Sequence, residues 1–300
     1  NLSCADIRDE GYVYNPPSED KGLVLRVALG CSHNACTFCG MYRNVGFRIR
    51  DLAEILPEIR ETKENKPNLK RVFLGDGNAL AAPTEQLLPI LQRLKATFPM
   101  LATISCAARA DDLLAKSVAE LAELRAAGLS LVYLGVESGD DEVLRSINKG
   151  VSAADVVRAG QAADAAGIDL STMIILGLGG RNRSEHHALH TADILNSLSP
   201  AMLGIMTLLP RAGTPLEKLV AGGQFERLGR NETLQELLML LQRLEVRRPA
   251  ILRASHLFNH LALEGGLPED KAALIGQVQA ELQKDPATAK ELSYKNYGIF

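Results

Sequence analysis

The chain has 300 residues, 46% of them hydrophobic and 23% charged, which is the composition of a globular protein with a sizeable core. Disordered and fibrous classes are therefore excluded. The formal net charge of −3 argues against a nucleic-acid partner, because binding along phosphates needs a basic surface. No apolar run approaches the roughly 20 residues that cross a bilayer, and the first residues are too acidic and polar for a secretion signal. We expect a cytoplasmic protein that does not contact membranes.

From about residue 23, short β-rich apolar runs alternate with amphipathic helical stretches. This alternation is typical of βα units that build a parallel sheet. The pattern predicts six strands, at residues 23–29, 71–75, 101–106, 130–136, 169–176 and 202–208. Helices are expected between them, with apolar faces at residues 52–59 and 113–124 and a serine cap before the helix that ends at Gly167.

The loop after the first predicted strand carries three of the five cysteines, Cys31, Cys36 and Cys39. In a reducing compartment such a cluster indicates a metal or redox site more than a disulfide framework. Thiolates at this spacing can hold three irons of a cubane and leave the fourth iron for a non-protein ligand. A structural zinc site with His33 as the fourth ligand is the alternative. Phe38 either packs the loop against the protein or contacts a bound nucleoside.

The second and third predicted strands also end in residues that can carry chemistry. Gly75, Asp76 and Gly77 suit a tight turn into a helix. Cys106 ends the third strand, where its thiol could donate a hydrogen atom to a substrate or lie inert in the core. Arg109 follows, and its guanidinium suits either a bidentate carboxylate ligand or a surface salt bridge.

The fourth and fifth predicted strands end in a carboxylate and in a glycine-containing apolar segment. Glu137 and Ser138 end the fourth strand, where Glu137 either faces a ligand or caps the next helix. Ile175 and Gly177 end the fifth, in a segment that lacks the spacing of a phosphate-binding fingerprint. The histidines that follow are interpreted as the polar face of a helix: His186, His187 and His190.

The strand pattern stops after residue 215, so the chain is predicted to have three parts. Residues 1–22 form a lead-in, residues 23–215 the core, and residues 216–300 a helical C-terminal extension. In the extension, His256 and Asn259 are candidate substrate ligands, although hydrogen bonds between helices explain them nearly as well.

The cysteine spacing, Cys-x4-Cys-x2-Cys with an aromatic residue before the last cysteine, resembles that of the radical S-adenosylmethionine (radical SAM) superfamily. The commonest form of that motif has three residues between the first two cysteines, so the gap of four is a departure. Residues 135–139, Gly-Val-Glu-Ser-Gly, resemble the oxygen-independent coproporphyrinogen oxidase-like and Elp3-like branches, and residues 253–260 an uncharacterised subfamily. The resemblance covers about residues 23–210. It implies an α/β fold, a partial (β/α)6 barrel of the TIM type with the helical extension.

The resemblance also implies two cofactors. A [4Fe-4S] cluster would be bound by Cys31, Cys36 and Cys39, and SAM would bind at the open iron. One electron from a reducing partner such as flavodoxin or ferredoxin would cleave SAM to methionine and a 5'-deoxyadenosyl radical, which abstracts a hydrogen atom from a small-molecule substrate. Two alternatives stay open, a zinc-stabilised binding protein and a radical SAM enzyme that modifies RNA.

SAM would be bound by residues at the later strand ends. The segment Gly75-Asp76-Gly77 corresponds to the one that holds the methionyl amino group, and Arg109 suits the SAM carboxylate. Glu137 is expected to accept hydrogen bonds from the ribose hydroxyls. The remaining expected contacts are Phe38 beside the cluster, Ser138 next to Glu137, and Ile175 and Gly177 against adenine.

Overall fold

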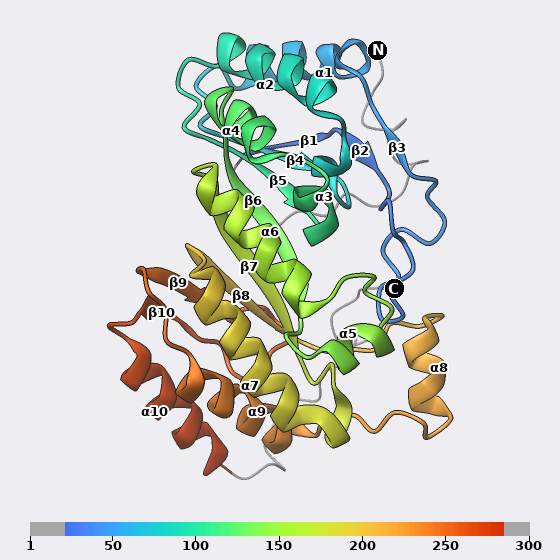
Figure 1. Cartoon of the computed structure of the whole chain (residues 1–300), viewed down its shortest axis with the longest axis vertical. Helices are drawn as coiled ribbons and strands as arrows, with labels where there is room; N and C mark the ends of the chain where they lie inside the picture. Colours follow the sequence, from blue (N-terminus) through green and yellow to red (C-terminus); the bar gives the residue numbers. More distant parts are fainter. Residues whose placement is uncertain (1–21, 285–300) are drawn as a thin grey trace. The chain divides into compact units, whose positions relative to one another are not determined.

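The computed structural model describes residues 22–284, which divide into two compact units (Figure 1). The first unit consists of residues 22–34, 41–135 and 158–170, and the second of residues 35–40, 136–157 and 171–284. The predicted lead-in lies outside the described residues, apart from residue 22.

Four parallel strands form the sheet of the first unit. They are neighbours in the order β1 (Leu23–Arg26), β4 (Arg71–Gly75), β5 (Thr103–Ala108) and β6 (Leu129–Glu137). The register places Val24 opposite Phe73 and Phe73 opposite Ser105. The last two residues of β6 already belong to the second unit. Most positions of these strands are buried, as expected for apolar runs in a parallel sheet.

A separate antiparallel pair closes the cysteine loop. In this pair β2 (Ala28–Leu29) lies beside β3 (Arg48–Ile49), with Ala28 opposite Ile49 and Leu29 opposite Arg48. The pairing joins the two ends of the segment 30–47, so the cysteines lie on a loop whose base is held by backbone hydrogen bonds.

Helices follow the strands of the first unit as predicted, with one difference. They are α1 (Leu52–Asn65), η3 (Ala79–Ala81), α2 (Thr84–Thr97), α3 (Ala110–Leu114) and α4 (Val118–Ala126). Asp51 caps the start of α1 and forms a capping box with Glu54, and Ile55 and Ile59 of this helix are buried one turn apart. The predicted helix at 113–124 is two helices, because Ser117 starts a new one with its own capping box.

The second unit also has four neighbouring strands. They are β7 (Asp169–Leu176), β8 (Met202–Thr207), β9 (Ala250–Arg253) and β10 (Glu264–Leu267), in that order. β7, β8 and β9 are parallel, and β10 is antiparallel to β9. Residues 216–300 are predicted to form a helical extension, but the described part of this stretch also contains the strands β9 and β10. Residues 169 and 170 of β7 belong to the first unit.

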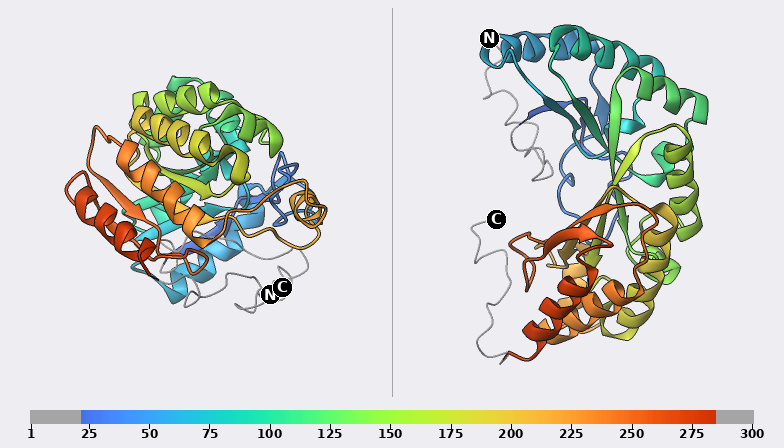
Figure 2. Two further views of the ribbon diagram at one scale, coloured as in Figure 1. Left: turned by 90° about the horizontal axis from the view of Figure 1, so that it is seen from below. Right: turned by 90° about the vertical axis from the view of Figure 1, so that its left-hand side faces the viewer.

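The helices of the second unit are α5 (Asp141–Ser146), α6 (Ala153–Ala165, from residue 158 in the first unit), α7 (Gly180–Leu198), α8 (Pro215–Ala221), α9 (Arg230–Arg243) and α10 (Lys271–Leu282). α9 contacts both α7 and α10, and Figure 2 shows these three as the yellow, orange and red helices. The buried face of α9 is formed by Leu234, Leu237 and Leu241, but it also contains Glu236. A fully buried glutamate is rare in a folded protein and requires partners.

Each of the six predicted segments contains a strand, although the first segment is divided into β1 and β2, and helices alternate with mostly parallel strands. The predicted α/β class is therefore confirmed. Among residues 22–284, no helix has the length and apolar character needed to span a bilayer.

Candidate functional site

The first cysteine lies directly against the turn that follows β4. Gly30 turns the chain with a φ of +71°, and a Cβ atom at Gly77 would lie 2.5 Å from the Gly30 oxygen and 2.9 Å from the Cα atom of Cys31. Ser32 donates its N–H to Oδ1 of Asn78 (2.9 Å), and Nδ2 of Asn78 donates to Oγ of Ser32 (2.7 Å). Glycine at position 77 is thus required by the close approach of the cysteine loop.

The other two cysteines lie on a turn that is anchored in the second unit. The Cys39 N–H donates to the Cys36 oxygen (3.2 Å). Between them, Thr37 donates its N–H to the oxygen of Ile147 at the end of α5 (2.8 Å) and accepts from the N–H of Leu216 at the start of α8 (3.0 Å). The turn is therefore fixed by backbone hydrogen bonds on both sides.

Phe38 packs against other residues of the second unit, which is the first of its two expected roles. Its ring lies against a buried apolar cluster formed by Val143, Leu144, Ile147, Leu178, Leu208 and Leu216. Cys31, Cys36 and Cys39 are all partly exposed, and none of them forms a disulfide. In the part of the chain that the structure describes, no three His, Cys, Asp or Glu side chains converge on a point that would hold a metal ion.

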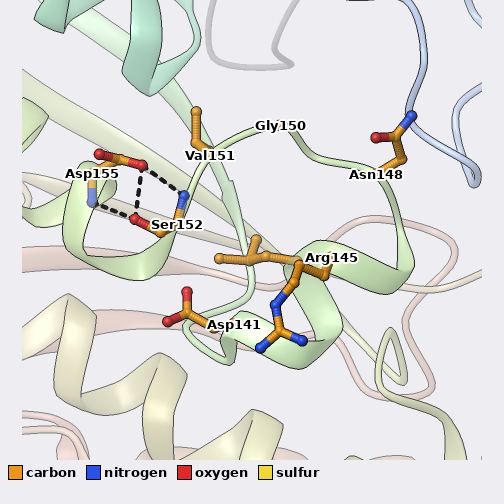
Figure 3. A pocket seen from close by; sticks show the side chains of 8 residues that line it. Asp141, Arg145, Asn148, Gly150, Val151, Ser152 and Asp155 are labelled. Carbon is orange, nitrogen blue, oxygen red and sulfur yellow. Dashed lines mark hydrogen bonds between the residues drawn. The ribbon is translucent and has the colours of Figure 1, made fainter.

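A cavity of about 360 Å³ lies beside α5 and α6, and Figure 3 shows the side chains that line it. Asn148 joins it to the cysteine loop by donating to the Ala35 oxygen (3.2 Å). Its two carboxylates hold the start of α6: Asp141 accepts from the Ala153 N–H (2.7 Å), and Asp155 from Ser152. Its acidic groups are thus engaged in helix capping.

The carboxylate of Asp76 is engaged within the first unit. Oδ2 accepts from Nη2 of Arg26 (3.0 Å) and Oδ1 from the Tyr42 hydroxyl (2.7 Å), and all of these groups are buried. The Gly75 oxygen accepts from the N–H of Val27 (2.6 Å). A guanidinium beside the carboxylate would repel an ammonium group, so the expected binding of the SAM amino group by the Asp76 side chain is corrected. Asp76 fixes the turn after β4 instead.

The buried side chain of Arg109 is paired with an exposed carboxylate. Its Nε donates to Oδ1 of Asp111 (2.9 Å) and its Nη2 to Oδ2 (3.2 Å). Of the two interpretations of Arg109, the structure shows the salt bridge, and the expected contact with the SAM carboxylate is not supported.

The end of β5 contains a buried carboxyl group that the sequence did not single out. Asp112 accepts from Nδ2 of Asn78 (3.0 Å to each oxygen) and from the Arg109 N–H (2.7 Å), and burial raises its pKa to about 6. Nearby, Cys106 is 1% exposed, and burial first, then the charge of Asp112, raises the pKa of its thiol. A thiol this deep cannot contact a substrate, so the expected hydrogen-donor role of Cys106 is corrected.

The end of β6 holds a buried ion pair in a strained backbone. Glu137 has a φ of +62°, a left-handed conformation that costs a non-glycine residue about 1–3 kcal/mol. Its Oε1 accepts from Nζ of Lys149 (2.9 Å), and both side chains are buried. Asp140, not Glu137, caps α5 by accepting from the N–H of Glu142 (2.8 Å), so the capping interpretation of Glu137 is wrong.

His187 links the ends of β6 and β7. Nδ1 lies 2.8 Å from Oγ of Ser138, and Nε2 lies 3.0 Å from the oxygen of Ile175. Because a carbonyl oxygen only accepts, Nε2 carries the proton and Nδ1 accepts from the Ser138 hydroxyl. The polar-face interpretation is wrong for His187, which is 0% exposed, and right for His186 and His190, which are exposed.

Glu236 reaches the end of β7 from α9. Gly177 has a φ of +79° and donates its N–H to Oε1 of Glu236 (2.6 Å), and the Ser184 hydroxyl donates to Oε2. Oε1 lies 3.7 Å from Nε2 of His187, and burial raises the pKa of Glu236. Neither Glu236 nor His187 was expected at the site. The one sequence signal was a glutamate within the apolar stripe of a helix.

The two candidate substrate ligands make internal contacts. Nδ2 of Asn259 donates to the oxygens of Ile205 and Ala254 (2.8 Å each), and its Oδ1 accepts from the Thr207 hydroxyl (2.9 Å). This amide holds β8 to the segment after β9, so its assignment as a substrate ligand is corrected. His256 accepts from the Phe258 N–H (3.2 Å), and burial lowers its pKa.

Known proteins resemble this chain in sequence and fold. An uncharacterised protein of Methanocaldococcus jannaschii is 28% identical over 228 residues, which are 73% of this chain and 70% of that protein. The heme chaperone HemW of Bacillus subtilis is 25% identical over 166 residues, which are 54% of this chain and 42% of HemW. Among solved structures, methylornithine synthase matches with a TM-score of 0.53 and 19% identity over 82% of this chain and 75% of that chain.

The sequence profile of the radical SAM superfamily matches residues 25–192, which include the cysteine loop and the ends of β4 to β7. This match spans more than half of the chain. The chain therefore belongs to the radical SAM superfamily, whose members are enzymes that use a [4Fe-4S] cluster and SAM.

Proposed function

We propose that Cys31, Cys36 and Cys39 bind the cluster and that the enzyme abstracts a hydrogen atom from a small-molecule substrate. The observation that carries the proposal is the cysteine loop, whose three partly exposed thiols lie between segments fixed by backbone hydrogen bonds. Three sulfur donors fit a cubane with one open iron. When bound, the reduced cluster supplies the electron that splits SAM into methionine and the 5'-deoxyadenosyl radical.

The end of β6 would hold the ribose of SAM. The carboxylate of Glu137 accepts hydrogen bonds from ribose hydroxyls, and Lys149 both neutralises this carboxylate and fixes its direction. Glu137 has a left-handed backbone conformation. Such strained conformations occur where the surrounding structure compensates their cost, and they cluster at binding sites. Ser138 supports this turn by accepting from the Asp140 N–H (3.0 Å).

The end of β7 would hold the adenine. Ile175 is partly exposed and packs against the same buried apolar cluster as Phe38, and Gly177 turns the backbone with its left-handed conformation. An aliphatic side chain beside a polar backbone edge is a suitable surface for a flat heterocycle. Gly77 contributes by letting the cysteine loop approach the turn after β4.

A small molecule is favoured as substrate by the acidic balance of the chain and by the likeness to methylornithine synthase, whose name identifies a small product. Flavodoxin or ferredoxin would supply the electron. We place the enzyme in the cytoplasm, where thiols stay reduced.

Anaerobic purification followed by a SAM cleavage assay tests the proposal. The wild-type protein should be brown, contain iron and sulfide, and release 5'-deoxyadenosine when reduced, and Cys36→Ala should lose all three properties. Cys106→Ala is the matched control, because it removes a buried thiol that we do not assign to the cluster. A colourless protein with bound zinc would contradict the proposal, and salt-sensitive retention of RNA would contradict a small-molecule substrate.

A further inference from the structure

We propose that Glu236 of α9 and His187 of α7 are positioning residues of the SAM site, because their buried side chains hold the backbone of Gly177 and Ile175 at the end of β7. The inference rests on the proposed function, which places SAM at Ile175 and Gly177. It adds that the region after residue 192, beyond the span of the family profile, contributes to the SAM site.

Gly177 needs a buried acceptor at this point. It is buried, and its left-handed backbone directs an N–H into the protein, where Oε1 of Glu236 meets it at 2.6 Å. A buried N–H without an acceptor costs free energy comparable to a lost hydrogen bond, so the turn is stable in this form only when an acceptor oxygen is present at this position. The same carboxylate accepts from Ser184 in the first turns of α7. Glu236 thus joins the β7 turn to two helices.

His187 fixes the neighbouring residue and couples it to the end of β6. Its Nε2–H donates to the Ile175 oxygen, and its Nδ1 accepts from Ser138, the residue next to Glu137. One imidazole therefore holds the turn proposed for the ribose and the strand end proposed for the adenine. Gly139 reinforces this contact with α7, because a Cβ atom there would lie 2.3 Å from the His190 oxygen.

The two side chains are also close to each other, with Nε2 of His187 3.7 Å from Oε1 of Glu236, and both are 0% exposed. A buried network whose members are all satisfied gives the backbone around it one defined arrangement. Neither side chain reaches solvent, so each acts on SAM through the backbone that it holds.

Glu236→Met is the informative variant, because methionine is nearly isosteric and removes the acceptor without leaving a buried charge. We expect the dissociation constant for SAM, measured with the cluster-loaded and unreduced protein, to rise about tenfold, since one buried hydrogen bond is lost. Glu236→Gln keeps an acceptor oxygen for Gly177 and should stay within about twofold of wild type. The matched control is Glu232→Met on the same helix, where Glu232 pairs with Arg181 at the surface. It should bind SAM as wild type does.

A purely structural role predicts a different result. Glu236→Met would then lower the melting temperature of the SAM-free protein but would not change the SAM dissociation constant measured well below that temperature. This outcome would overturn the inference. If Glu236→Met does not fold, the SAM dissociation constants of His187→Leu and His187→Gln are compared instead. His187→Gln should bind SAM more tightly than His187→Leu, because glutamine can still donate a hydrogen bond to the Ile175 oxygen. A cluster-loaded wild type that does not bind SAM would instead refute the proposed function.

Discussion

Charged side chains lie at the strand ends of both units, but they are held in different ways. In the first unit, Asp76 is bound by Arg26 and Tyr42, and Arg109 is bound by Asp111. In the second unit, Glu137 is paired with Lys149 through Oε1. The backbone at the end of β7 forms hydrogen bonds with the buried side chains of His187 and Glu236. The difference indicates that a charged side chain at a strand end can bind a ligand only when other residues form the hydrogen bonds that fix the backbone around it. We therefore expect substitutions in the first set to change stability and substitutions in the second set to change SAM affinity.

The largest expected effect is the loss of stability when the buried pair of the first unit is broken. Asp76→Asn should lower the free energy of unfolding by about 3–5 kcal/mol, because the buried Arg26 guanidinium loses the charged carboxylate with which it is paired. Urea unfolding measures this effect. Arg48→Gln, at the exposed pair with Glu54, is the control and should cost about 0–1 kcal/mol. A SAM dissociation constant that rises in Asp76→Asn while stability is unchanged would break the comparison.

Asp112 gives the first unit a pH dependence. Burial raises its pKa from 3.8 to about 6, so the folded state binds this proton more tightly than the unfolded state does. Between about pH 4 and pH 6 the folded state holds more protons, and its stability therefore falls as the pH rises through this window. The contribution is about 3 kcal/mol at most, from 1.36 kcal/mol per pKa unit. Asp112→Asn should lack this slope in urea unfolding followed from pH 4 to pH 7, and an unchanged slope would contradict the assignment.

The positions of most strands could be predicted from the sequence, but the hydrogen-bond and ion-pair partners of the charged side chains could not. β1 and β4 to β8 were found from continuous apolar runs. β9 was missed because four residues after Pro249 give too little pattern, and β10 because it contains two glycines. Arg26 is 50 residues from Asp76, and Glu236 is 59 residues from Gly177. Such pairs exist only after the sheet has formed, so local sequence contains no signal for them.

The local signals at the candidate site were of a different kind. Cysteine spacing and the Glu-Ser-Gly segment mark positions where chemistry is expected, and both lie within the residues that match the profile of the superfamily. The role of each side chain depended on its neighbours. His187 and His190 are three residues apart on one helix, yet one is completely buried and the other is exposed.

The smallest expected effect is a change in SAM affinity, which is compared between Glu137 of the second unit and Arg109 of the first unit. Glu137→Gln should raise the SAM dissociation constant about tenfold, because an amide accepts hydrogen bonds from the ribose hydroxyls more weakly than a carboxylate does. Arg109→Ala should stay within about twofold of wild type, because the guanidinium is already paired with Asp111. Isothermal titration of the cluster-loaded proteins measures both values. If Arg109 does bind the SAM carboxylate, Arg109→Ala will weaken binding and Asp111→Asn, which releases the guanidinium, will strengthen it. Opposite shifts in these two variants would move Arg109 from the structural set to the SAM site, whereas two unchanged values would keep the SAM-binding charges at the end of β6.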